Sequence, residues 1–410
     1  MDACPRFAPH DPVQTADPYP TYAALRRDAP VFHDPRLDVW VLSRYDDVVA
    51  AVKQPEVFSC NGALTAAGKF APSVQAVFAG SAGLAAILNE SDGPVHTRLR
   101  GAFGRWFNRE RVTLMEPHIR AIAGELIDGF EAEGEADLMA EFAALLPGLV
   151  ICDLLGVPRG DFPKIKDWTD DWLTLISAGV PEEDQIRCAH NLLAYMQYLR
   201  EHFLERQKNP GEDLMTVLLP RELGGAADLR LDEAIVNVMD FFAAGFGTTS
   251  NMIANGMATL FEYGEQYDRL RQDPTLLDNA VEEILRFASS VQGAFRVTTR
   301  PIELSGVTIP AGGRVFLLYG SANHDEARFE NPEVFDIDRS PVRDHLTFSR
   351  GIHFCIGSAL ARLEIRIALE LLLKRLPALR PVPGAVPLRL DHLYLNGYHT
   401  LPVEWDPSVS

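Results

Sequence analysis

Apolar residues recur at spacings of three and four over most of the stretch from residue 95 to 290, which predicts that this part of the chain is mostly helical. One pattern runs unbroken from about Asp232 to Tyr263, well beyond the usual helix of about 8–20 residues. Further helices are predicted at residues 19–29, 46–53 and 357–376.

Strand-like runs are few and lie toward the two ends of the chain. They predict a strand within residues 39–45, a pair of strands joined by a Pro-Gly turn within 307–323, and a β-like tail over 392–405. Residues 61–90 are rich in alanine, glycine and serine without a clean period, which predicts a mobile loop region. The predicted fold class is therefore mainly α with a small β region.

No long Pro/Gly/Ser-rich linker, charge block, low-complexity segment or repeat divides the 410 residues, so we expect a single domain over residues 1–410. The net charge of −19 argues against nucleic acid or an anionic membrane as a partner. The N-terminus does not resemble a signal peptide, no stretch is long and apolar enough to span a membrane, and the five cysteines are scattered. We expect a monomeric protein in a reducing cytoplasm.

The segment "FSRGIHFCIGSALAR", residues 348–362, holds the strongest chemical signal in the chain. Cys355 lies between Gly351 and Gly357, just before a strongly helical run. A helix N-terminus lowers the pKa of a nearby thiol, and the glycines would let a flat ligand approach the sulfur. The alternative is a buried, inert cysteine in a turn, and the segment alone does not decide between the two.

Phe348, Gly351, His353, Cys355 and Gly357 resemble the Phe-x-x-Gly-x-(Arg/His)-x-Cys-x-Gly signature of the cytochrome P450 family. Three other segments, "GPVHTRLR", "AGFGTT" and "EEILR", resemble motifs of the same family and stand in its order along the chain. The resemblance runs from about residue 17 to the end and implies the cytochrome P450 fold, of the bacterial, ferredoxin-dependent type. It also implies haem b as the cofactor, with Cys355 as the thiolate ligand of the iron.

The resemblance assigns further residues to the cofactor. Four bases match family positions that bind the haem propionates through charge-assisted hydrogen bonds, namely His96, Arg100, Arg296 and His353. Phe348 and Gly357 belong to the same predicted site. Taken singly, each of the four bases would more often be a solvated surface residue.

Glu283 and Arg286 lie three residues apart and therefore share one helix face. An exposed pair of this kind would contribute less than about 1 kcal/mol. The resemblance implies instead a buried network with Arg339 that braces the cysteine loop, which is a structural role and not a catalytic one.

Residues 95–111 hold five arginines and one acid in a chain of strongly negative net charge. Arg105, Arg109 and Arg111 are not among the residues assigned to the haem. A solvated basic face is the common explanation for such a run. The resemblance implies that this segment docks an acidic ferredoxin, which would deliver electrons from NAD(P)H by way of a ferredoxin reductase.

Gly245 and Gly247 interrupt the long central pattern at a cost of about 1 kcal/mol each relative to alanine. By resemblance, this helix crosses the distal face of the haem, where both glycines would open the backbone beside the oxygen. Thr248 falls on the position of the alcohol that helps to deliver protons there.

The residue before that threonine is usually Asp or Glu in the family, and here it is Gly247. Water in the vacated space could replace the acid, with Asn251 orienting it and Asp240 acting only through a water chain. The enzyme would then be a normal monooxygenase. In the alternative, the haem serves a peroxide-driven or non-oxygenating reaction, and a third possibility is a haem sensor or carrier without catalysis.

By resemblance, the substrate pocket includes Ala243, Ala244, Val291, Ala294 and Tyr398. The two alanines on the central helix leave room for a bulky group, and no basic residue stands out as an anchor for a carboxylate. These features predict a small to medium hydrophobic substrate. The expected reaction is the insertion of one oxygen atom from O2 by hydroxylation, epoxidation or dealkylation.

Overall fold

The computed structural model describes residues 7–63, 70–79, 85–176 and 180–406. The chain divides into two compact units. Unit 1 comprises Met1–Phe58, Val112–Pro147 and Gly247–Ser410, and unit 2 comprises Ser59–Arg111 and Gly148–Phe246. The single domain expected from the sequence stays a prediction.

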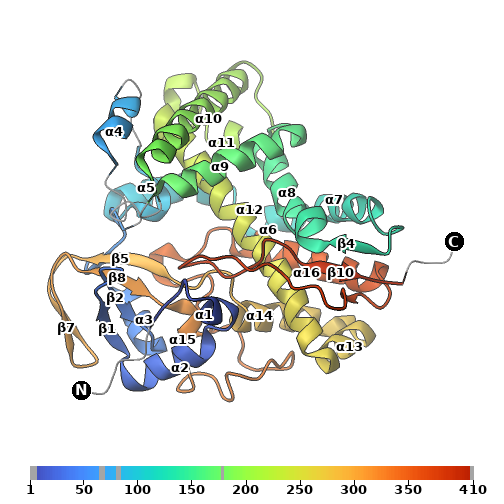
Figure 1. Cartoon of the computed structure of the whole chain (residues 1–410). Coiled ribbons are helices and arrows are strands. Elements are labelled where there is room, and N and C mark those ends of the chain that lie inside the picture. The colour runs from blue at the N-terminus through green and yellow to red at the C-terminus, as the bar shows by residue number, and fades with distance from the viewer. Residues whose placement is uncertain (1–6, 64–69, 80–84, 177–179, 407–410) are drawn as a thin grey trace. The chain divides into compact units, whose positions relative to one another are not determined.

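Unit 1 combines helices with a mixed β-sheet (Figure 1). Helix α14 packs on α16, and α16 packs on α7. The helices of this unit are α1 (Pro12–Ala16), α2 (Tyr19–Asp28), α3 (Tyr45–Val52), α7 (Glu116–Asp128), α13 (Gly264–Gln272), α14 (Leu277–Phe287), α15 (Tyr319–Ala322) and α16 (Ser358–Arg375), with a π-helical turn at Met139–Ala143.

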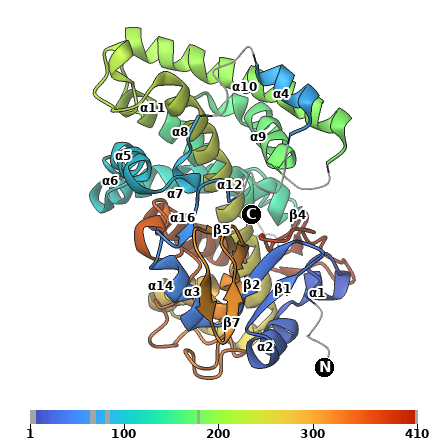
Figure 2. The same cartoon turned by 90° about the vertical axis from the view of Figure 1, so that its left-hand side faces the viewer.

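The main sheet has the strand order β1-β2-β8-β5-β3, and its strands β1, β2 and β5 are labelled in Figure 2. Strand β2 pairs antiparallel with β1 and parallel with β8, and β8 pairs antiparallel with β5. Leu42 and Leu317 from this sheet share one apolar cluster with Val48 of α3, so the helix covers a buried face of the sheet. The strands are β1 (Val31–Asp34), β2 (Val39–Leu42), β3 (Phe58–Ser59), β5 (Ala294–Thr298) and β8 (Arg314–Leu317).

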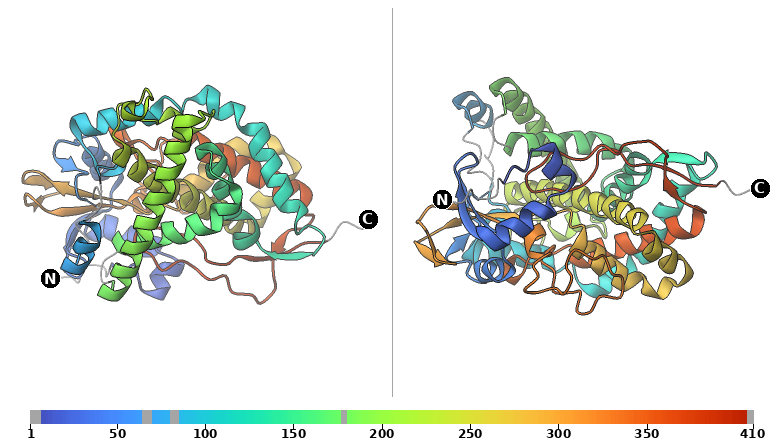
Figure 3. Two further views of the ribbon diagram at one scale, coloured as in Figure 1. Left: turned by 90° about the horizontal axis from the view of Figure 1, so that it is seen from above. Right: turned by 60° about the horizontal axis from the view of Figure 1, so that its bottom comes forward.

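Two smaller sheets complete the β-structure of unit 1. Strands β4 (Glu135–Asp137), β10 (Pro402–Glu404) and β9 (Arg380–Pro381) form one of them. Strands β6 (Ile302–Leu304) and β7 (Val307–Ile309) form a hairpin that stands away from the main sheet (Figures 1 and 3).

The pairing predicted between the two strands within residues 307–323 is wrong. Both strands exist and a turn with Gly312 at φ +75° separates them, but β7 pairs with β6 while β8 pairs with β2 and β5. Alternation along one segment marks where strands lie and does not name their partners, which here come from distant parts of the chain.

Unit 2 is helical apart from its share of β3. The long helix α10 packs against α9, α4 and α11. The helices are α4 (Pro72–Phe78), α5 (Gly93–Gly104), α9 (Phe162–Ile176), α10 (Glu182–Lys208) and α11 (Leu214–Val217).

Helix α4 corrects the loop region predicted over residues 61–90. This short helix begins with Pro72 and buries Val74 and Phe78, although the alanine-rich sequence around it has no clean period. Residues 64–69 and 80–84 of the predicted loop lie outside the described residues.

Three helices take residues from both units, namely α6 (Arg109–Leu114), α8 (Leu145–Leu155) and α12 (Leu231–Glu262). Helix α12 is continuous over 32 residues, within one residue of the predicted bounds at each end. The predicted class, mainly α with a small β region, is confirmed. Over the parts of the chain described above, no helix combines the length and apolar character needed to cross a membrane.

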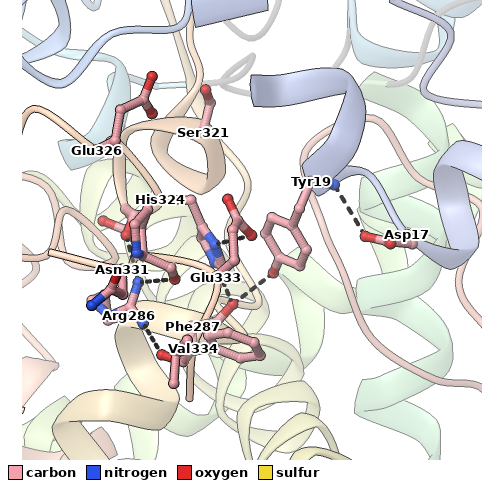
Figure 4. A network of polar contacts seen from close by, with 12 residues as sticks. Asp17, Tyr19, Arg286, Phe287, Ser321, His324, Glu326, Asn331, Glu333 and Val334 are labelled. Carbon is pink, nitrogen blue, oxygen red and sulfur yellow. Dashed lines mark hydrogen bonds and ion pairs between the residues drawn. The ribbon is translucent and has the colours of Figure 1, made fainter. Parts of the chain in front are cut away.

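A buried ion pair ties α14 to the chain that follows α15. Arg286 and Glu283 are both fully buried, and two hydrogen bonds of 2.8 and 2.7 Å join the guanidinium to the carboxylate. Arg339 donates to the same carboxylate at 3.0 Å. Arg286 also donates to the carbonyl oxygens of Asn323 and Val334, part of which is visible in Figure 4. These bonds neutralise the buried charge and satisfy the donors of Arg286.

Replacing Glu283 with glutamine should lower the free energy of unfolding by about 3–5 kcal/mol, because two guanidinium groups would lose their counterion in the interior. Urea unfolding followed by circular dichroism measures this loss. Glu303→Gln removes an exposed carboxylate from β6 and should change stability by less than about 0.5 kcal/mol. A loss below about 1 kcal/mol in Glu283→Gln would show that water reaches the pair in solution.

Candidate functional site

A tight turn presents Cys355 just before α16. Gly351 has φ +71°, and a Cβ built on it would lie 2.8 Å from the carbonyl oxygen of Val52, so only glycine fits there. The backbone N–H of Cys355 donates to the carbonyl oxygen of Phe348 at 2.9 Å and closes the turn. Cys355 is exposed, so the sulfur lies at the surface of unit 1, close to the positive end of the α16 dipole.

The surroundings of the sulfur fit a flat apolar ligand. Ile352 is 43% exposed and Phe354 is 40% exposed, which is unusual for large apolar side chains placed side by side in a turn. A Cβ on Gly357 would come within 4.0 Å of the sulfur, and glycine keeps that side clear. A thiol at a helix N-terminus with open apolar side chains beside it fits the binding of an iron porphyrin, which such a thiol would hold as its thiolate.

The segment before the turn is held by buried polar contacts. The side chain of Asn323 accepts from the N–H of Leu346 at 2.6 Å and donates to the hydroxyl of Thr347 at 3.0 Å. That hydroxyl donates to the carbonyl oxygen of Leu285 at 2.5 Å. Because Arg286 binds the carbonyl oxygen of Asn323, the ion pair of α14 connects through Asn323 to the start of the cysteine loop.

Phe348 is nearly buried at the base of the loop. The guanidinium of Arg362, from α16, lies 4.5 Å from the centre of its ring. Arg362 in turn binds Glu282 of α14, with bonds of 2.7 and 3.0 Å. The loop is thus fixed from α14 on one side and from α16 on the other.

The four bases predicted to bind propionates divide between the units. His96 and Arg100 lie on α5 of unit 2, where burial and then the charge of Arg100 lower the pKa of His96. In unit 1, Arg296 is buried in β5 and donates to the carbonyl oxygen of Phe295 at 2.6 Å, and His353 is half-buried in the cysteine loop. Their joint role stays a prediction.

Helix α12 carries an open stripe within a mostly buried surface. Ala244 is exposed, and Ala243, Gly247 and Thr248 are half-buried, whereas Phe242, Phe246, Thr249 and Ser250 are buried. The first four of these positions are spaced by three and four residues and therefore share one face of the helix. The residues predicted for oxygen chemistry and for the substrate thus lie together along this face.

The two glycines of α12 have different surroundings. A Cβ on Gly245 would lie 2.6 Å from the Cδ1 atom of Ile151, so this glycine lets α8 approach within unit 2. A Cβ on Gly247 would meet no atom within 4 Å. The expectation that both glycines open the backbone at the haem is therefore corrected for Gly245, which helix packing explains.

Asn251 fastens the chain tail to α12. Its amide donates to the carbonyl oxygen of Gly247 at 2.9 Å, and its oxygen accepts from the N–H of Tyr398 at 3.3 Å. A Cβ on Gly397 would lie 2.0 Å from that oxygen, so the contact is close. Asn251 thus holds the backbone at Gly247, and its predicted role in orienting water stays a prediction.

Two acids have a raised pKa. Burial raises the pKa of Asp240, on α12, to about 7, although a hydrogen bond of 3.0 Å from Asn89 lowers it in part. Burial alone raises the pKa of Glu364, on α16, to about 8. Glu364 was not among the predicted site residues; it is one of two acids in the run "ALARLEIRIALELL", and the pattern does not indicate which of the two is buried.

The remaining predicted pocket residues do not share one environment. Val291 and Ala294 pack partly against the apolar cluster of the main sheet. Tyr398 is buried and borders a cavity of about 550 Å³ in unit 1, whose lining includes neither of these residues nor the two alanines of α12.

The arginines of the predicted docking segment, residues 95–111, are only partly exposed to solvent. Arg98 is bound by Glu233 through two side-chain contacts within unit 2. Arg111 lies 5.0 Å from the centre of the Trp106 ring. Arg105 and Arg109 are exposed, so these two guanidinium groups are the accessible part of the cluster.

Comparisons with known proteins identify the family of this chain. The family model described as Cytochrome P450 matches residues 180–382. The steroid C26-monooxygenase of Mycobacterium tuberculosis (strain ATCC 25618 / H37Rv) is 36% identical over 389 residues, which cover 94% of this chain and 93% of that protein. The cytochrome P450 monooxygenase PikC of Streptomyces venezuelae is 37% identical over 399 residues, which cover 95% of this chain and 91% of that protein.

A solved structure of cytochrome P450 CREJ in complex with (4-ethylphenyl) dihydrogen phosphate has a TM-score of 0.91 to this chain. The two are 31% identical, and the match covers 98% of this chain and 100% of that one. The matched length is nearly the whole chain, so it includes the cysteine turn and the long helix α12 described above. The chain therefore belongs to the cytochrome P450 family and is a monooxygenase whose cofactor, haem b, is bound through a cysteine thiolate.

Proposed function

We propose that Cys355 is the thiolate ligand and that the enzyme inserts one oxygen atom from O2 into a small to medium hydrophobic substrate. The observation that carries this proposal is the exposed sulfur of Cys355 at the start of α16, with open apolar side chains beside it. Bound haem supplies the oxygen activation. His96, Arg100, Arg296 and His353 would hold its propionates, and Phe348 and Gly357 would border it.

An uncharged, hydrophobic substrate follows from the side chains of the proposed pocket. Ala243 and Ala244 form the open part of α12, and Val291 and Ala294 are apolar as well. None of them can pair with a carboxylate, so a charged ligand would lose its hydration without compensation. The name of the relative from M. tuberculosis, a steroid C26-monooxygenase, supports a substrate of this class.

Optical titration of the ferric protein should show a shift of the Soret band with neutral polycyclic compounds such as steroids, because they displace water from the iron. A carboxylated derivative of the same steroid should bind at least about tenfold more weakly, since its charge would be buried without a partner. Equal affinity for the two compounds would contradict the apolar pocket.

The proposed supply of protons differs from the family pattern, because Gly247 replaces the usual acid. Thr248 would hold a proton relay at its hydroxyl, and the space at Gly247 would hold water where related enzymes have a carboxylic acid. Asp240, whose pKa is about 7, lies seven residues earlier on α12, or about 10 Å along the helix, and would reach that water only through others. A second candidate function, turnover with peroxide or without oxygen insertion, rests on the same missing acid.

Gly247→Asp should raise the yield of product per NAD(P)H consumed, because it restores an acid beside Thr248 at a position with room for a side chain. Gly247→Asn adds the same volume without the acid and is the matched control. The measurement compares product, NAD(P)H and peroxide in each variant. If both variants match the wild type, protons reach the site by another route; wild-type turnover with peroxide alone would favour the second function.

For the electron supply, we propose that Arg105 and Arg109 dock an acidic ferredoxin, which receives electrons from NAD(P)H through a reductase. Both side chains are exposed, in a chain of net charge −19. A local positive patch on a negative protein would steer an acidic partner to this face.

The double variant Arg105→Glu/Arg109→Glu should slow reduction of the haem by ferredoxin by about tenfold or more at low salt and flatten its salt dependence. Stopped-flow absorbance measures both effects. Lys208→Glu/Arg300→Glu makes the same change of charge at two other exposed positions and should have little effect. Equal slowing by the two double variants would assign the effect to net charge instead of to a docking patch.

A further inference from the structure

Unit 1 contains a cavity of about 550 Å³ to which no part of the proposed reaction assigns a role. It lies between the first turn of α2, the C-terminal part of α12, the end of α14 and the chain tail. Its volume falls in the range of about 300–1,000 Å³ that is typical of sites for small molecules. Thr259 of its wall stands eleven residues after Thr248, about 16 Å further along α12.

Aromatic rings form much of the wall, from Tyr19, Tyr263, Phe287 and Tyr398. Contacts hold the ring of Tyr19 in place: its hydroxyl donates to the carbonyl oxygen of Phe287 at 2.8 Å, and it stacks on the ring of His324 with centroids 4.0 Å apart (Figure 4). The ring of Tyr263 meets Phe287 edge to face at 5.6 Å. A wall of fixed rings offers apolar surface and negative π faces.

The charges around the cavity are mostly negative. Asp17, Glu262 and Glu333 line it, against the single base Arg389. Arg389 is already engaged, 4.7 Å from the centre of the Tyr398 ring and 3.4 Å from the side-chain oxygen of Asn396. Burial opposes the ionisation of Glu333, but a hydrogen bond with His324 and nearby positive charges outweigh it and keep the pKa of this carboxyl below its usual range.

A buried acceptor in the same wall lacks a donor. Asn255 is 3% exposed, and its amide nitrogen donates to the carbonyl oxygens of Ala288 at 2.9 Å and Asn396 at 3.1 Å. Its side-chain oxygen has no hydrogen-bond partner among the described residues. This oxygen has almost no accessible surface, so Asn255 contributes to the cavity by fixing the wall through its amide nitrogen and not by accepting from a ligand.

We propose that this cavity is a second binding site, which takes a small organic cation that carries N–H donors on an aromatic or apolar body. The aromatic rings would hold the body and the face of the cation, and the carboxylates would neutralise its charge and accept its N–H bonds. Of the residues predicted for the substrate pocket, only Tyr398 lines this site, and the proposal does not depend on which compound the enzyme oxidises.

Hydrogen bonds connect this cavity to α12 at Gly247. Tyr398, in the wall, donates its N–H to Asn251, and the amide of Asn251 donates to the carbonyl oxygen of Gly247. A ligand that fixes Tyr398 would therefore also fix the backbone of α12 at Gly247.

Benzamidine and benzamide test the site, because they share size and N–H donors and differ in charge. Isothermal titration calorimetry would be carried out on the holoenzyme with 4-phenylimidazole bound to the iron, so that the haem centre is already filled. Benzamidine should bind at least about tenfold more tightly than benzamide. Loss of binding when the iron is ligated, or equal binding of the two compounds, would overturn the proposal.

Two variants and one control locate the binding. Glu262→Gln should weaken benzamidine about three- to fivefold, as expected for a partly exposed carboxylate, and Ala258→Phe should abolish binding by filling the cavity. Glu265→Gln removes an exposed carboxylate outside the cavity and should leave affinity unchanged. Wild-type binding by both Glu262→Gln and Ala258→Phe would place benzamidine elsewhere. The Soret titration with steroids tests the proposed function independently, so either idea can fail alone.

Discussion

The charge of Arg286 has to be neutralised inside the protein, and much of unit 1 follows from how this is done. A guanidinium with no exposed surface binds Glu283 on its own helix and three carbonyl oxygens in the chain that follows α15. Because every one of these buried donors needs an acceptor, a shift of the chain around Asn323 would leave an N–H group of Arg286 unsatisfied. Asn323 then places Leu346 and Thr347, which lead directly into the turn of Cys355. The exposed sulfur is thus positioned by a buried ion pair nearly seventy residues earlier in the chain.

The sequence predicted best what depends on neighbouring residues. The bounds of α12 and α16 follow from apolar spacing alone, and the cysteine turn is marked by Gly351, whose positive φ glycine adopts most easily. It predicted worst what depends on distant partners. The pairing of β7 with β6, and of β8 with β2 and β5, is decided by segments that local alternation does not identify. Helix α4 is too short for its period to stand out.

The glycines of α12 show the same limit at the level of one residue. Gly245 and Gly247 look alike in the sequence, yet one faces Ile151 at a distance that no Cβ could tolerate and the other faces open space. The spacing of glycines therefore predicts a close contact with the helix, but it does not identify the group that makes this contact. Only Gly247 leaves room beside Thr248, and so only Gly247 bears on how protons arrive.

Buried amides along the second half of α12 link that question to the tail of the chain. Asn251 and Asn255 occupy buried positions where apolar side chains would cost less free energy to desolvate. Both form hydrogen bonds with the tail: Asn251 accepts from the N–H of Tyr398, and Asn255 donates to the carbonyl oxygen of Asn396. Gly397 between them has no space for a side chain, so the tail can lie on the helix in one way only. The same two residues reach the backbone at Gly247 on one side and the wall of the 550 Å³ cavity on the other. The hydrogen bonds of these buried amides thus fix the position of the tail on α12, which apolar packing of equal stability would not specify.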